Sequence, residues 1–111
     1  MRFFRNIAKW FSKKYSFYSS PKFRYETVED SPALIPEKKI LIVDEGTPES
    51  LVFKCPCGCN ADIYLNLLKD AKPQWNYRIT KKGNITISPS VWRKVGCKSH
   101  FFIREGKIEW V

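Results

Sequence analysis

Three cysteines occupy alternate positions in one short segment, and a fourth follows 38 residues later. The set is Cys55, Cys57, Cys59 and Cys97. Thiols at such close spacing are more often metal ligands than disulfide partners, because a disulfide between cysteines two positions apart is strained. Soft thiolate ligands suit zinc, and Pro56 and Gly58 let the backbone turn tightly around one ion. We therefore predict that the four cysteines bind one zinc ion, which joins two distant parts of the chain.

The spacing of these cysteines leaves more than one ligand set open. Cys55 and Cys59 fit the usual spacing of a zinc-binding pair, whereas Cys57 does not. His100 is a fifth candidate ligand for four places, and three bound thiols would leave an open position for Lewis-acid chemistry. A thiolate-rich zinc ion is a weak Lewis acid, so we favour a structural site made by all four cysteines. Two disulfides, or plain buried thiols, are the alternatives.

His100 is the only histidine of the chain, and two serines are its candidate partners. A lone histidine is usually a core or surface residue, but a strand end pinned by zinc is a rigid place for a general base. In extended backbone, Ser99 and His100 would point to opposite faces. Ser90 could approach His100 within the roughly 2.6–3.2 Å that proton transfer needs. We predict Ser90 as nucleophile and His100 as base, with Ser99 as the second candidate nucleophile.

A structural interpretation of the segment around Ser90 competes with the catalytic one. Ser90 follows a proline and can cap a short helix, so residues 89–95 are a candidate helix. No spacing identifies an acid that would orient His100. Asp62, Glu105 and Glu109 are candidates by residue type alone.

Seven short runs of apolar and β-branched residues must position these side chains. They are Lys38–Val43, Ser50–Lys54, Asp62–Leu68, Trp75–Thr80, Asn84–Ser88, His100–Arg104 and Lys107–Val111. Glycine-containing turns at 81–83 and 105–106 connect two pairs of runs as hairpins. We predict a mainly β fold, a small antiparallel β domain over residues 38–111. A domain of this size has little core, which is a physical reason for a zinc staple.

The N-terminal part of the chain differs from the body in its charge. The formal net charge is +9, and residues 1–24 supply +7 of it because they contain no acidic residue. Residues 1–25 form a basic aromatic arm, in which apolar side chains recur at helical spacing over residues 2–12. We predict a short amphipathic helix that packs on the domain or contacts a partner, nucleic acid or an anionic membrane. Residues 26–37, with two prolines and four acidic residues, are predicted to be a linker.

The length of 111 residues allows one domain with a short appendage and excludes large multidomain enzymes. No apolar run approaches the roughly 20 residues of a transmembrane helix. The first 20 residues lack the continuous apolar region of a signal peptide. We therefore expect a cytoplasmic protein.

Several segments together resemble one known family. They are Phe53–Cys59, Ile85–Val91, Cys97–Ile103 and Gly106–Trp110, with Trp75 between the first two. The combination is similar to a small bacterial and phage family of zinc-binding proteins, the BubE-like family, long described as a domain of unknown function. Some members are linked to bacterial ubiquitin-like conjugation pathways as deubiquitinase-like serine peptidases. The resemblance covers residues 50–111. It implies a zinc-bound fold, a hydrolytic centre at Ser90 or Ser99 with His100, and a ubiquitin-like partner.

The sequence thus supports two functional hypotheses from different classes. The first is a peptidase that processes or removes a ubiquitin-like modifier, with Ser90 and His100 at its centre. The second is a non-catalytic zinc module that binds protein, nucleic acid or anionic membrane through residues 1–25. The distances from the His100 ring nitrogens to the two serine hydroxyls would discriminate between them.

Overall fold

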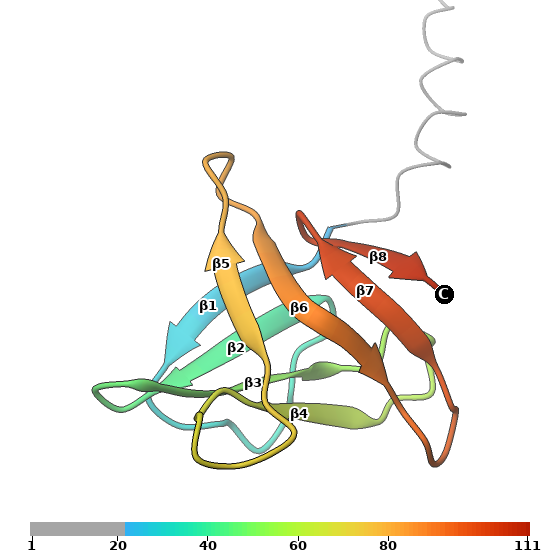
Figure 1. The fold of residues 1–111 in the computed structure, drawn as a ribbon, viewed down its shortest axis with the longest axis horizontal. Coiled ribbons are helices and arrows are strands. Elements are labelled where there is room, and N and C mark those ends of the chain that lie inside the picture. The colour runs from blue at the N-terminus through green and yellow to red at the C-terminus, as the bar shows by residue number, and fades with distance from the viewer. Residues whose placement is uncertain (1–21) are drawn as a thin grey trace, which may run out of the picture.

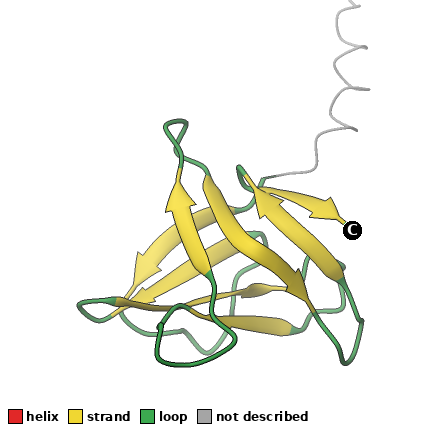
Figure 2. Ribbon diagram, in the orientation of Figure 1, coloured by secondary structure: helices red, strands yellow, loops and turns green. Residues whose placement is uncertain are grey.

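The computed structural model describes residues 22–111, so the helix predicted over residues 2–12 lies outside the described residues. Within the described part, the chain forms strands and no helix (Figure 2). The strands are β1 (Arg24–Val28), β2 (Lys39–Asp44), β3 (Pro48–Lys54), β4 (Asp62–Asn66), β5 (Asn76–Ile79), β6 (Ile85–Trp92), β7 (His100–Arg104) and β8 (Lys107–Trp110). The mainly β fold predicted from the sequence is confirmed. None of the described residues belongs to a helix long and apolar enough to cross a membrane.

The eight strands form two sheets of four strands each (Figure 1). One sheet has the order β1-β2-β3-β4 and the other the order β5-β6-β7-β8. All neighbours are antiparallel except β1 and β2, which run parallel. The seven runs predicted to be strands correspond to β2 through β8. Such runs can be recognised because their apolar residues either alternate with polar ones or follow one another without a break.

The core lies between the two sheets and takes its side chains from both. Phe53 and Ile63 of the first sheet pack with Ile85, Phe101 and Ile103 of the second. A second, smaller cluster explains why β2 is buried on both faces, since part of the segment before β2 covers the outer face of the first sheet. Its members are Ile35, Leu41, Val43 and Val52. Strands that pack against the core on one face only show the alternation of buried and exposed residues that the sequence predicts.

Strand β1 crosses the boundary that the sequence analysis sets between the arm (1–25) and the linker (26–37). Its register is Arg24 opposite Lys39 through Val28 opposite Val43. Just before it, Phe23 is buried and meets the Phe53 ring edge-on, with ring centroids 6.1 Å apart. β1 carries no apolar alternation of its own, and its strand conformation comes from pairing with β2. The folded body therefore includes residues from 23 onward.

Gly106, in the β7–β8 turn, connects the segment before β1 to the second sheet through hydrogen bonds. Its N–H donates to the Ile85 carbonyl at 2.7 Å, and its carbonyl accepts from the Phe23 N–H at 2.8 Å. Its φ of +77° is in the left-handed region, and an added Cβ would lie 2.9 Å from the Phe23 carbonyl oxygen. A side chain here therefore meets backbone that is itself hydrogen-bonded.

We expect Gly106→Ala to destabilise the domain clearly more than Gly83→Ala does. Gly83 has a similar φ of +83°, but nothing lies within 4 Å of its added Cβ. Gly83→Ala should cost about 1–2 kcal/mol of left-handed strain, and Gly106→Ala about 1–3 kcal/mol more for the steric clash. Denaturant unfolding of the two variants measures the difference. Equal losses in the free energy of unfolding would show that the Phe23 segment can move away from the added methyl group at little cost.

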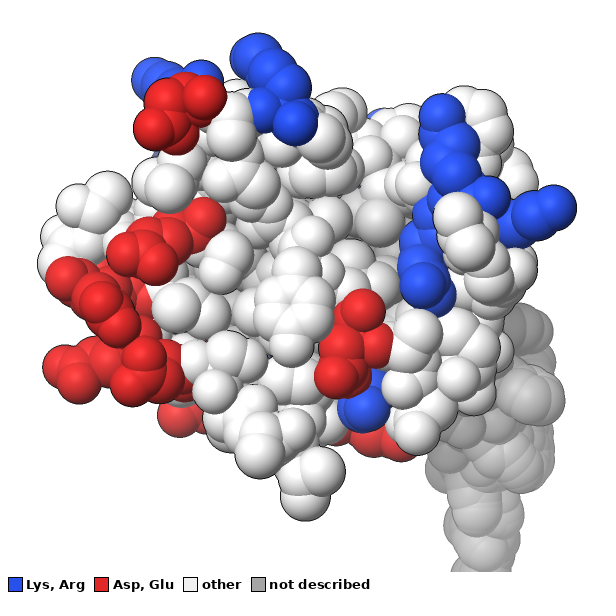
Figure 3. Space-filling model, turned by 90° about the horizontal axis from the view of Figure 1, so that it is seen from below, with Lys and Arg blue, Asp and Glu red and all other residues white. Residues whose placement is uncertain are grey.

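Charge is unevenly spread over the described surface. Seen from below, acidic side chains gather at one end of the face and Lys and Arg side chains toward the other (Figure 3). Acidic side chains also act on one another: the pKa of Glu45 is raised, first by a hydrogen bond with Asp30 and then by repulsion from Asp30, Glu49 and Glu29. Residues 25–111, whose formal net charge is +9 less +7, or +2, thus carry acidic and basic groups in separate places on this face.

Candidate functional site

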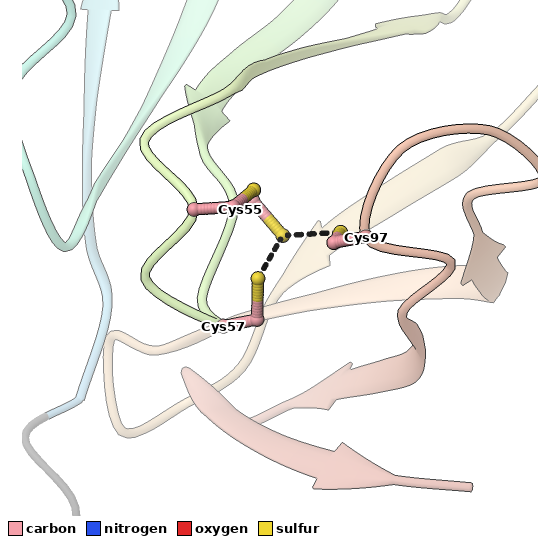
Figure 4. A group of neighbouring side chains, drawn as sticks. Cys55, Cys57 and Cys97 are labelled. Carbon is pink, nitrogen blue, oxygen red and sulfur yellow. Dashed lines mark hydrogen bonds between the residues drawn. The ribbon is translucent and has the colours of Figure 1, made fainter.

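The four cysteines come together from two loops, one in each sheet. Cys55, Cys57 and Cys59 lie in the β3–β4 connection, and Cys97 lies in the β6–β7 connection. Figure 4 shows Cys55 between Cys57 and Cys97, with its sulfur directed toward both. All four are free thiols, of which Cys55 is buried and the other three are exposed. The cluster joins the two sheets at one end of the core.

Tight turns bring the thiols of the first loop to one point. The Cys55 N–H donates to the Ala61 carbonyl at 2.8 Å, and the Gly58 N–H donates to the Cys55 carbonyl at 3.3 Å. Gly58 and Asn60 have φ values of +94° and +68°, which reverse the chain within a few residues. The glycine that the sequence analysis identified as a turn residue therefore has this role.

The sulfur positions fit a tetrahedral metal ion. In a zinc–sulfur site with bonds of about 2.3 Å, neighbouring sulfur atoms lie about 3.8 Å apart. Here the Cys55 Sγ lies 3.5 Å from the Cys57 Sγ and 3.7 Å from the Cys97 Sγ. All four Sγ atoms lie within 4.8 Å of one another. The cluster can therefore hold one metal ion through four sulfur ligands without His100.

The surroundings of the cluster favour thiolates at its exposed side. Hydrogen bonds from the Ser99 hydroxyl and the Ser99 N–H lower the pKa of Cys97 to about 6. Burial raises the pKa of the Cys55 thiol to about 11. The Arg93 guanidinium lies close to two sulfurs, with Nη1 3.3 Å from the Cys97 Sγ and 3.6 Å from the Cys59 Sγ. A cation here offsets part of the negative charge that four thiolates would bring to a metal ion.

Ser99, the second candidate nucleophile, lies beside the thiols. Its Oγ lies 3.2 Å from the Cys97 Sγ and 3.9 Å from the Cys55 Sγ. No hydrogen bond in residues 22–111 joins Ser99 to His100. This agrees with the expectation that the two side chains point to opposite faces of an extended strand.

Ser90 and His100 lie together on the outer face of the β5–β8 sheet. The Ser90 Oγ lies 2.9 Å from the His100 Nε2, and both residues are half-buried. Their neighbours Val91 and Phe101 point the other way, into the core. A hydroxyl at this distance from an imidazole nitrogen can pass its proton to the ring.

A β-bulge sets the position of Ser90. Ile87 pairs with Ile103, but the next pair is Val91 with Phe101, so residues 88–90 face the single residue Phe102. Pro89 has no N–H for the ladder, which explains an interruption at this point. Bulges often redirect a side chain at functional sites. The helix considered for residues 89–95 is therefore wrong: β6 continues to Trp92, because pairing with β7 overrides the capping signal of Ser90.

The three acids considered as orienting groups are engaged elsewhere. Asp62 forms an ion pair with Lys54 at 2.8 Å, and Glu109 forms one with Arg104. Glu105 accepts a hydrogen bond of 2.9 Å from the Thr80 hydroxyl in the β5–β6 connection, and hydrogen bonds from Thr80 and Asn84 lower its pKa.

The His100 imidazole also contacts an aromatic side chain. The Trp92 ring stacks on the imidazole with centroids 4.8 Å apart and planes 8° apart. The sequence analysis did not single out Trp92. Its contact with His100 comes from the β6–β7 register, so no sequence signal pointed to it.

The described residues form a small β domain that presents a half-exposed serine–histidine pair and a four-sulfur cluster. A family model described as bacterial ubiquitination-like system serine protease (BubE) matches residues 27–111. No curated protein and no solved structure shows a significant match. The chain belongs to the BubE family. This confirms the family resemblance, and the match begins well before residue 50, where the quoted motifs begin.

Proposed function

We propose that this chain is a serine protease that hydrolyses an amide bond at the C-terminal end of a ubiquitin-like protein. Ser90 is the nucleophile and His100 the general base. The observation that carries the proposal is the 2.9 Å contact between the Ser90 Oγ and the His100 Nε2. The family description, a serine protease of a ubiquitination-like system, supports both the reaction and the substrate class.

The two side chains suffice for the proton transfers of amide hydrolysis. Ser90 Oγ forms a bond to the carbonyl carbon while its proton passes to His100 Nε2. His100 returns that proton to the amine nitrogen as the carbon–nitrogen bond breaks, leaving an ester on Ser90. Water then attacks the ester, giving its proton to His100, and the carboxylic acid leaves as Ser90 regains a proton.

The exposed position of the pair suits a protein substrate. An open groove of about 910 Å³ lies elsewhere, lined by residues around the start of β1 and the β5–β6 turn. Ser90 and His100 lie outside it, on the face of a sheet. A flexible chain end of a folded modifier can reach such a surface, whereas a small molecule would need an enclosing pocket.

We also infer that the metal held by the cysteines is zinc and that its role is structural. Four thiolate ligands in a tetrahedral arrangement are typical of structural zinc sites, which leave no open position. Zinc here would tie the β3–β4 loop to the β6–β7 loop, and the latter leads directly into His100. The hydrolytic chemistry belongs to the side chains of Ser90 and His100.

A fluorophosphonate probe tests the proposed nucleophile directly. Ser90 Oγ would displace fluoride from phosphorus, with its proton taken up by His100, and mass spectrometry of digested protein should place the adduct on Ser90. The labelled chain should also lose its ability to cleave a ubiquitin-like protein fused at its C-terminus to a reporter. An adduct on Ser99 would overturn the assignment. A chain that neither reacts nor cleaves would favour the non-catalytic zinc module.

The alternative in which residues 1–25 bind nucleic acid or an anionic membrane concerns a segment that lies almost wholly outside the described residues. The family match begins at residue 27, after this segment. No contact or comparison supports it here.

A further inference from the structure

We propose that Trp92 is the positioning residue of the Ser90–His100 pair, in the role that a carboxylate has in a Ser-His-Asp triad. Its indole holds the plane of the imidazole and stabilises the protonated ring that forms when Ser90 gives up its proton. The inference rests on the proposed function and adds to it a residue that neither the family description nor the serine–histidine contact identifies.

The backbone register places the two rings against each other. Trp92 lies directly opposite His100 in the β6–β7 ladder. The next pair, Arg93 and Ser99, is hydrogen-bonded, with the Arg93 N–H donating to the Ser99 carbonyl at 2.8 Å. Hydrogen-bonded and non-hydrogen-bonded pairs alternate, so Trp92 and His100 form the closer, non-hydrogen-bonded kind. Cross-strand side chains of such a pair make direct contact.

Two contacts, which act in perpendicular directions, then fix the orientation of the imidazole. The Trp92 stack, with planes 8° apart, limits tilting of the ring. The Ser90 hydroxyl, 2.9 Å from Nε2, limits rotation within the ring plane. Together they direct the Nε2 lone pair at Ser90, which requires the tautomer that carries its proton on Nδ1. A triad carboxylate achieves the same orientation by binding Nδ1.

The indole also favours the charge that develops on His100. An aromatic face attracts a cation, and tryptophan does so best among the aromatic side chains. The Trp92 ring already contacts one cation, since the Lys94 Nζ lies 4.4 Å from its centroid. Of the other charged groups, Arg93 contacts two thiols and Arg104 pairs with Glu109, whereas the Lys94 ammonium lies against the Trp92 ring itself. Because imidazolium forms only as the reaction proceeds, this attraction lowers the barrier rather than strengthening substrate binding.

Three single variants test the role in the full-length chain. Trp92→Leu should lower kcat and the rate of fluorophosphonate labelling about tenfold with KM unchanged, since the lost attraction acts in the transition state. Trp92→Phe keeps an aromatic face and should recover most of the rate. Trp110→Leu is the matched control, because Trp110 is similarly exposed but meets Phe101 edge-on instead of His100. It should leave both rates unchanged.

NMR provides a readout that does not depend on activity. The chain has one histidine, so its imidazole signals are unambiguous. Stacking under an indole shifts these ring protons upfield, and the shift should vanish in Trp92→Leu while persisting in Trp110→Leu. An unchanged shift, or a Trp92→Leu variant with wild-type kcat, would overturn the proposal. If the wild-type chain neither labels nor cleaves, the proposed function fails, and the catalytic role of Trp92 with it. The upfield shift of the His100 ring protons would then decide only whether Trp92 holds the plane of the imidazole.

Discussion

Replacing either Ser90 or His100 by alanine is expected to abolish hydrolysis, with a loss in kcat of at least about 10³-fold for each variant. The two side chains act as one unit: without His100 the Ser90 proton has no acceptor, and without Ser90 no acyl group is transferred. The double variant should therefore be scarcely worse than either single one. Initial rates of cleavage of a ubiquitin-like fusion, measured at saturating substrate, check both effects.

Two serine variants serve as controls for this result. Ser88→Ala lies in the same bulge but is exposed, and it should retain the wild-type rate. Ser99→Ala removes the rival nucleophile, whose hydroxyl lies beside the thiols, and should also remain active. An inactive Ser99→Ala that keeps its metal, together with an active Ser90→Ala, would reverse the assignment. Metal content should be measured alongside, because Ser99 hydrogen-bonds to Cys97.

His100→Ala also distinguishes a base from a metal ligand. Four sulfurs already lie within 4.8 Å of one another, and the His100 Nε2 is directed at Ser90. We therefore expect His100→Ala to keep its metal and its melting temperature while losing activity. Loss of metal and stability together would place His100 in the coordination sphere.

Most of the fold could be predicted from local sequence patterns. β4 shows why: Ile63 and Leu65 are buried, while the intervening Tyr64 is exposed, so the alternation in the sequence is the alternation of faces. Glycine-containing turns located the hairpins in the same way. β1 could not be predicted, because its residues are mostly exposed and its conformation comes from parallel pairing with β2, from which residues 29–38 separate it.

The candidate site was predictable only in part. The thiol cluster could be expected because residue type alone restricts the chemistry of closely spaced cysteines. The sequence allowed Ser90 to approach His100 across the sheet, but it placed Ser90 beyond the end of a strand and gave no sign of the bulge. The stacking of Trp92 on His100 depends on the register across that bulge, which no local pattern fixes. Residue type was also misleading for Glu105 and Glu109, whose partners lie on other turns and strands.

Removing the metal is expected to unfold the domain rather than merely to inactivate it. The cysteine cluster joins a loop of one sheet to a loop of the other, and three of its four thiols are exposed, so a metal ion bound there would be a main link between the two loops. Binding of structural zinc by thiolate sites contributes about 10–16 kcal/mol of apparent free energy, which is comparable to the whole stability of a small domain. Protein purified without added metal should contain about one zinc ion per chain.

Chelation followed by circular dichroism and thermal melting tests this expectation. Cys97→Ser should lose zinc and melt at a much lower temperature, because it removes the ligand supplied by the second loop. Ser88→Ala again provides a control that should keep both. Loss of activity on chelation should follow the loss of structure and never precede it, if the metal supports the loop that leads into His100 without entering the reaction, as proposed. A metal-free chain with an unchanged melting curve would show that the core and the sheet pairing alone suffice.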